Sequence, residues 1–209
     1  SFFVYAYRLI KECRGSKLDF SILKPKRNFI IHNYVTDLAG ILAGSLDKII
    51  IAPMFGFIIL GNYYLGIQFL TLLTLIPTLV YQYILPQDAS GVSNRKLKIL
   101  VIMVSAVISF LGILLSPIII PIFFPKFIDT IQVVQIISLV LIPHSIMLIL
   151  QSQFLAKLKS RIVLIGNGIF AIIQISSILS LGSILGINGI ASGMVLASIG
   201  QASFYIISN

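Results

Sequence analysis

Long hydrophobic runs alternate with short polar segments along this 209-residue chain. A helix needs about 20 apolar residues to cross the hydrocarbon core of a bilayer, which is about 30 Å thick. Six runs reach this length, and they predict membrane-spanning helices at residues 28–53, 62–85, 99–124, 130–156, 162–185 and 189–208. The connections between them are short, so neighbouring helices must be antiparallel. The pattern therefore predicts an all-α membrane protein with a six-helix transmembrane bundle over residues 28–209.

The composition agrees with a chain that lies mostly in lipid. Charged residues make up 10% of the sequence and hydrophobic residues 58%, whereas a typical soluble domain has about 25% charged residues. The mean hydropathy is +1.07. So few polar residues could not cover the core of a soluble protein of this length, and the single cysteine, Cys13, excludes a disulfide scaffold.

The basic residues are concentrated in three clusters that lie between the apolar runs. The clusters are Arg8, Lys11, Arg14, Lys17, Lys24, Lys26 and Arg27; Arg95, Lys96 and Lys98; and Lys157, Lys159 and Arg161. All three fall on the same side of the six predicted helices, and the positive-inside rule makes this side cytoplasmic. We therefore expect a multi-pass protein of the plasma membrane with both ends of this chain in the cytoplasm. Basic residues in this arrangement do not indicate nucleic-acid binding, despite the net charge of +9.

The first residues predict a further membrane segment. Residues 1–10 are apolar and aromatic, and the basic segment 11–27 follows them directly. A signal peptide has the opposite order, with basic residues before the apolar stretch. We expect residues 1–10 to be the end of a preceding transmembrane helix and 11–27 to be a cytoplasmic loop. The chain is then the C-terminal part of a larger membrane protein.

Polar residues follow one face of the first predicted helix, at steps of three and four. They are Asn33, Asp37, Gly40, Gly44 and then Asp47 or Lys48. Asp37 lies close to the bilayer midplane, where an ionised carboxylate costs about 2.5–3.5 kcal/mol on insertion scales. We hypothesise that Asp37, held in place by Asn33, couples transport to an ion. Helix packing is the alternative for this face, since glycines four residues apart let a neighbouring backbone approach closely.

Prolines and polar residues also interrupt the later predicted helices. Pro143 is expected to bend the fourth helix, and His144 beside it can accept a proton near neutral pH. The prolines of the second and third helices predict bends there as well: Pro77, Pro117 and Pro121.

Two further polar faces lie on the last two predicted helices. One face carries Asn167, Gln174 and Ser177, and the other carries Gly189, Gly193, Ala197 and Gln201. Such faces are typical of pore lining or of helix packing, and the spacing is compatible with both.

Enzyme chemistry has no counterpart in the sequence. There is no Gly-rich phosphate loop, no His/Cys metal spacing and no nucleophile motif, and Glu12 is the only glutamate. The longest polar stretches, 11–27 and 86–98, are too short to form a catalytic domain. We expect a protein without enzymatic activity and without a metal or cofactor.

Residues 46–86 have a distinctive combination of Gly, Pro, Tyr and Asp within an apolar run. They read LDKIIIAPMFGFIILGNYYLGIQFLTLLTLIPTLVYQYILP, and residues 186–201 read GINGIASGMVLASIGQ. These segments resemble the oligosaccharide flippases of the polysaccharide transporter family, within the multidrug/oligosaccharidyl-lipid/polysaccharide exporter superfamily. The resemblance covers about residues 20–209.

The resemblance implies a transporter made of two six-helix halves around a central cavity. This chain would supply the second half, with the N-terminal half of the same protein as its partner. The implied substrate is a lipid-linked oligosaccharide, flipped from the cytoplasmic to the outer leaflet during cell-surface polysaccharide synthesis, with H+ or Na+ as coupling ion. The alternatives are a cation-coupled drug exporter of the same superfamily and a membrane subunit or enzyme of polysaccharide synthesis. The candidates for the translocation path or for coupling are Asp37, Asn33, Asp47, Lys48, His144, Asn167, Gln174 and Gln201.

Overall fold

The computed structural model describes residues 31, 34–35, 38, 45, 47–91 and 94–209. The chain divides after Ile31, and the residues from His32 onward form the compact unit described below. Residues 1–30, most of the first predicted helix, and the candidates Asn33 and Asp37 therefore lie outside the described residues. The described part is helical and contains no strand, which confirms the all-α class for this part of the chain.

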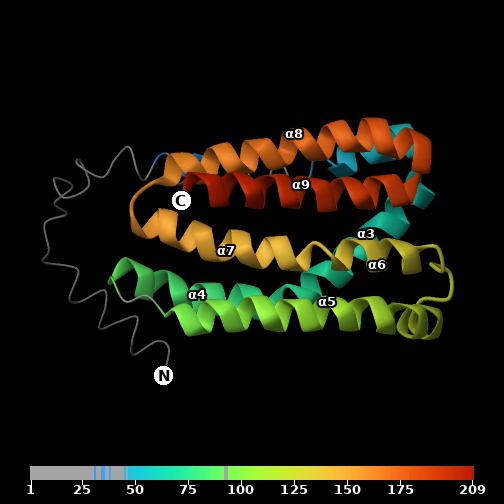
Figure 1. Ribbon diagram of the computed structural model, residues 1–209. Coiled ribbons are helices and arrows are strands. Elements are labelled where there is room, and N and C mark those ends of the chain that lie inside the picture. The colour runs from blue at the N-terminus through green and yellow to red at the C-terminus, as the bar shows by residue number, and fades with distance from the viewer. Residues whose placement is uncertain (1–30, 32–33, 36–37, 39–44, 46, 92–93) are drawn as a thin grey trace, which may run out of the picture. The chain divides into compact units, whose positions relative to one another are not determined.

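A helical segment at residues 47–55 precedes a series of longer helices. These are α3 (Phe57–Leu73), α4 (Leu75–Ala89), α5 (Arg95–Phe123), α6 (Thr130–Ser138), α7 (Leu141–Ala156), α8 (Ser160–Leu185) and α9 (Ile187–Ser208). Figure 1 shows α8 and α9 running antiparallel along one side of the bundle, with α4 and α5 on the other side and α7 between them.

Three of these helices, α5, α8 and α9, are each long and apolar enough to cross a membrane. Two pairs meet the same criteria together but are bent, α3 with α4 by 47° and α6 with α7 by 40°. The described residues therefore provide three candidate membrane spans, or up to five if each bent pair counts as one span.

Both bends have the same cause in the sequence. Pro77 and Pro143 are each the third residue of the helix that follows a break, α4 or α7. Proline has no backbone N–H, so it cannot donate to the carbonyl four residues earlier, on Leu73 or Leu139. The first turn of a helix tolerates this loss. The preceding helix therefore ends at the break, and a new helix begins there with the proline in its first turn. The bends predicted near Pro77 and Pro143 are confirmed, whereas α5 continues without a break past its own two prolines.

Two connections are much shorter than the sequence predicted. Residues 54–61 were expected to form a loop, but the helix continues to Phe55 and α3 begins at Phe57. Gly56 alone interrupts the helix, with a φ of 85°, and Gly186 separates α8 from α9 with a φ of 59°. Only glycine adopts such angles readily, so one residue suffices for each connection. As a consequence Asn62 lies inside α3 and is buried.

Glycines bring α8 and α9 into close contact. Gly189 lies so near to α8 that a Cβ atom there would overlap the carbonyl oxygen of Leu181. At Gly193 a Cβ atom would lie 2.6 Å from the Cβ of Ser177. Ala197 is fully buried on the same face. This part of the predicted polar face of the last helix is therefore a packing surface.

Small residues also join α5 to the bent pair α6–α7, which the sequence analysis did not anticipate. The hydroxyl of Ser145 donates to the hydroxyl oxygen of Ser105 over 2.6 Å. Ser109 donates to the carbonyl oxygen of Ser138 over 2.7 Å, and Gly112 packs against the Ser138 side chain. The residues of α5 in these contacts recur every three or four positions, so they lie on one face of the helix. Through this face the otherwise apolar helix α5 packs specifically against α6 and α7.

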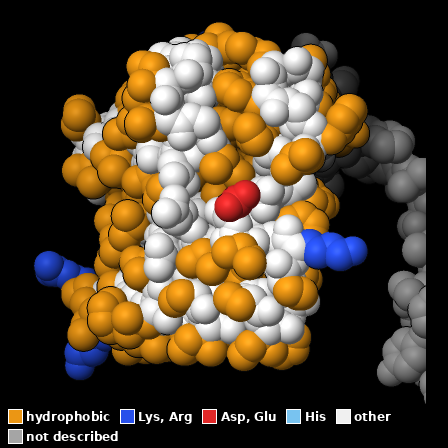
Figure 2. All heavy atoms as spheres, turned by 90° about the vertical axis from the view of Figure 1, so that its right-hand side faces the viewer, with side chains coloured by type: hydrophobic (Ala, Val, Ile, Leu, Met, Phe, Trp, Pro, Cys, Tyr) orange, Lys and Arg blue, Asp and Glu red, His pale blue; other side chains and the backbone are white. Residues whose placement is uncertain are grey.

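Charge is distributed unequally between the two ends of the bundle. The α4–α5 and α7–α8 connections lie together at the end that we call the basic end (Figure 1), with Arg95, Lys96, Lys98, Lys157, Lys159 and Arg161. The opposite end carries the connection from α5 to α6, with Lys126 and Asp129. Figure 2 shows that opposite end covered mainly by hydrophobic side chains, with few charged ones. This asymmetry is the pattern to which the positive-inside rule applies.

Labelling of single cysteines tests which end is cytoplasmic. In a Cys13→Ser background, Lys159→Cys at the basic end should resist a membrane-impermeant maleimide added to intact cells, whereas Lys126→Cys should react. Both lysines are exposed, in contrast to Ser160 and Asn62, whose burial makes them poor label sites. Reaction of Lys159→Cys in intact cells would reverse the predicted orientation.

Candidate translocation pocket

A cavity of about 380 Å³ lies where the two helix breaks meet α8 and α9. Thr74 and Val140, the residues at the breaks, both belong to its wall. The other lining residues are Ile67, Leu70, Thr71, His144, Met147, Gln151, Asn167, Phe170, Met194, Ser198 and Gln201. Irregular backbone at membrane depth is tolerated where it borders a cavity. We call this cavity the translocation pocket, after the role that we propose for it below.

Three of the sequence-predicted candidates meet in this pocket: His144, Asn167 and Gln201. The side-chain nitrogen of Gln201 donates to the side-chain oxygen of Asn167 over 2.8 Å and to the hydroxyl oxygen of Tyr205 over 3.1 Å. Tyr205 in turn donates to the carbonyl oxygen of Val163 over 3.1 Å. This chain of hydrogen bonds fixes the two amides against each other across α8 and α9.

The same geometry leaves donors available to a ligand. Within the described structure, the side-chain nitrogen of Asn167 and the ring of His144 donate no hydrogen bond. His144 lies in the first turn of α7, where its backbone N–H donates to the carbonyl of Val140 over 2.9 Å. The described wall has amides, hydroxyls, an imidazole, two thioethers and a phenyl ring, without a carboxylate, ammonium or guanidinium group. Such a lining suits an uncharged polar group with apolar faces.

The other candidates among the described residues lie outside the lining of the pocket. Asp47 is buried, and its carboxylate accepts a hydrogen bond of 2.9 Å from the hydroxyl of Tyr63. The side-chain nitrogen of Gln174 donates to the same hydroxyl oxygen over 3.5 Å. The ammonium of Lys48 lies 5.2 Å from the centre of the Tyr64 ring. Asp47 and Gln174 therefore form a buried cluster with Tyr63, and neither they nor Lys48 belong to the lining of the pocket.

Neighbouring helices separate these candidates from the pocket residues. Asp47 is 5% exposed and connects the helical segment 47–55 to α3 and α8. Asn167 and Gln174 share one face of α8, yet Asn167 lines the pocket and Gln174 belongs to the buried cluster with Tyr63. The reason is that the neighbours of α8 change along its length, which the spacing of polar residues does not reveal.

Polar residues outside the candidates predicted from the sequence lie on α3 and α4. Gln68, Thr71 and Gln82 are exposed on the bent pair, and Thr71 and Thr74 line the pocket itself. Uncharged polar side chains within a membrane span usually face a protein surface or water rather than lipid. Gln68, Thr71 and Thr74 recur every three residues up to the break, and this spacing was a signal that could have identified them.

Comparisons with family models, with curated proteins and with solved structures found no match for this chain. The described residues also contain no group of three His, Cys, Asp or Glu side chains placed to hold a metal ion. The argument for function therefore rests on the fold and on the chemistry of the pocket.

Proposed function

We propose that this protein is a membrane transporter that flips a lipid-linked oligosaccharide from the cytoplasmic to the outer leaflet. One observation carries the proposal: two interrupted helices and the amide pair of α8 and α9 border one pocket within the candidate membrane spans. Transporters commonly bind their substrates near the bilayer midplane at discontinuous helices of this kind.

The lining of the pocket is compatible with a sugar. Sugar rings offer many hydroxyl groups and an apolar face, and the pocket supplies the amides of Asn167 and Gln151 beside the ring of Phe170. Its volume of about 380 Å³ falls within the range of about 300–1,000 Å³ that is usual for ligand pockets. The described lining has no cation for the phosphate linkage, so we assign that contact to the N-terminal half of the transporter.

Coupling to an ion gradient is part of the proposal, with H+ or Na+ as the ion. His144 lies in the wall of the pocket beside the break before α7, and an imidazole is a side chain that can take up or release a proton. Asp37 stays a second candidate from the sequence, outside the described residues.

A drug exporter of the same superfamily is the second candidate function. Met147, Met194 and Phe170 give the pocket a soft, adaptable apolar wall, and methionine-rich surfaces are common in proteins that bind varied ligands. This wall would accommodate an amphipathic small molecule as well as the face of a sugar.

Reconstitution into liposomes tests the proposal. We expect the protein to move a lipid-linked oligosaccharide with a fluorescent sugar between leaflets, so that an impermeant quencher reaches nearly all of the probe rather than half. A parallel assay measures uptake of an amphipathic fluorescent cation under a pH or Na+ gradient. Uptake of the cation without flipping would favour the drug exporter, and inactivity in both assays would contradict a transport function.

A further inference from the structure

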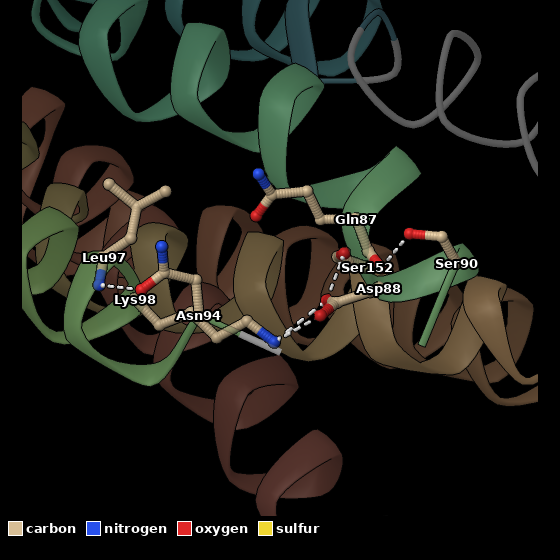
Figure 3. A network of polar contacts seen from close by, with 7 residues as sticks. All are labelled: Gln87, Asp88, Ser90, Asn94, Leu97, Lys98 and Ser152. Atoms are coloured by element: carbon tan, nitrogen blue, oxygen red, sulfur yellow. Dashed lines mark hydrogen bonds and ion pairs between the residues drawn. The ribbon is translucent and has the colours of Figure 1, made fainter. Parts of the chain in front are cut away.

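A buried polar cluster ties three helices together at the basic end (Figure 3). The ammonium of Lys98, on α5, lies 2.7 and 2.9 Å from the two carboxylate oxygens of Asp88, on α4. Ser152, on α7, donates to the same carboxylate over 2.7 Å. The side chains of Lys98 and Asp88 are only 9% and 6% exposed. Asp88 therefore joins α4 both to α7 and to α5.

Two of these three helices begin at a break, and the third is continuous. α4 and α7 each begin at a break, at Thr74 and Val140, and these two breaks lie together in the wall of the translocation pocket. α5 instead continues without a break from Arg95 to Phe123. The prolines after the breaks remove a backbone hydrogen bond at each, so a change of bend angle there disrupts fewer hydrogen bonds than elsewhere. The cluster therefore joins α4 and α7, which can bend at their breaks, to α5, which has no break.

A second cation lies within the same surroundings. A cavity of about 350 Å³ adjoins the cluster and is lined by Asp88, Lys98 and Lys157, together with Gly91, Gln153 and Ala156. Lys157 directly follows the last residue of α7, so it belongs to the hinged side of the cluster. The side-chain oxygen of Gln87, next to Asp88, is buried without a hydrogen bond within the described structure. Asp88 and Lys157, a second cation, therefore border the same cavity.

From this geometry we propose that α4 and α7 move as one unit about hinges at Thr74 and Val140, and that Asp88 acts as the latch by exchanging Lys98 for Lys157. In the structure described, Asp88 holds α4 and α7 against α5. When the unit swings away, the Ser152 contact within the unit is kept and the Lys98 contact to α5 opens. Pairing with Lys157 then keeps the carboxylate compensated, which matters because an unpaired buried charge is strongly unfavourable. The swing changes the width of the translocation pocket toward the basic end.

Spin-label distances in lipid nanodiscs test the latch. In a Cys13→Ser background, one label on Asn209, directly after α9, is combined with a second label on Ala89 (α4), Leu155 (α7) or Lys96 (α5). We expect Lys98→Met to produce a second distance population for the α4 and α7 labels, in equal fractions, and none for the α5 label. Adding Lys157→Met should reduce that population, whereas adding Lys159→Met, from the same segment but outside the cavity, should not.

Asp88→Asn provides an independent variant, because it releases Lys98 without leaving a buried carboxylate unpaired. It should produce the same second population, and that population should be insensitive to Lys157→Met. Three results would each overturn the proposal: an unchanged single distance in both Lys98→Met and Asp88→Asn, a matching shift of the α5 label, or unequal populations for α4 and α7. Equal loss of the second population with Lys157→Met and Lys159→Met would overturn the exchange of partners.

Discussion

Replacing Gly189 by alanine is expected to destabilise the protein strongly, by about 1–3 kcal/mol or more, as is usual for overpacking. The added Cβ would overlap the backbone carbonyl oxygen of Leu181 on α8. A backbone group cannot turn away as a flexible side chain can, so α8 and α9 must separate. Thermal unfolding of the purified protein in one detergent measures the effect as a lower midpoint temperature.

Gly168→Ala is the matched control for this substitution. Gly168 also lies within a helix of the same pair, but no atom beyond its own stretch of helix backbone lies within 4 Å of the place where its Cβ would be. Alanine is favoured over glycine inside a helix by about 1 kcal/mol, so the midpoint should stay the same or rise. An equal loss for both variants would mean that α8 and α9 do not pack as described.

Tyr63→Phe is expected to lower stability by about 1–3 kcal/mol, the usual cost of leaving a buried polar group unsatisfied. The substitution removes the hydroxyl that donates to Asp47 over 2.9 Å and accepts from Gln174 over 3.5 Å. Asp47, Tyr63 and Gln174 are all buried, so no solvent replaces the lost hydrogen bond. The same thermal unfolding assay measures this change.

The neighbouring tyrosine supplies the control. Tyr64 is 45% exposed, and its ring face toward Lys48 is retained in Tyr64→Phe. Exposed substitutions of this kind usually change stability by no more than about 0.5 kcal/mol. Similar losses for Tyr63→Phe and Tyr64→Phe would show that the hydrogen bond to Asp47 does not stabilise the fold.

Hydropathy and proline positions were enough to predict much of the fold. Runs of about 20 apolar residues gave the candidate spans, and the bends follow from Pro77 and Pro143. The predicted connections 54–61 and 186–188 contain Gly56 and Gly186, but their one-residue length could not be predicted, because the apolar run continues across each glycine. A glycine in an apolar run can pack, bend or reverse the chain, and only its backbone angles distinguish these cases.

The pocket was predictable in part. His144 beside Pro143 and the polar residues Asn167 and Gln201 were identified from spacing, and the structure brings these three together. Spacing did not show that Asp47 and Gln174 would be satisfied by Tyr63, since that depends on which helices become neighbours. The resemblance to oligosaccharide flippases stays a prediction, because a helical fold with a pocket does not identify what the protein does or binds.

The central claim is that substrate passes through the translocation pocket, and filling that pocket tests it most directly. Met194 lines the pocket, whereas Met103 of α5 is 62% exposed and does not line it. The rate of lipid-linked oligosaccharide flipping in liposomes is compared among the wild-type protein, Met194→Trp and Met103→Trp. Equal thermal midpoints in detergent establish that the variants are folded. We expect Met194→Trp to lose flipping by at least about tenfold, equivalent to about 1.4 kcal/mol in the barrier, and Met103→Trp to retain it. Wild-type flipping by a folded Met194→Trp variant would contradict the account.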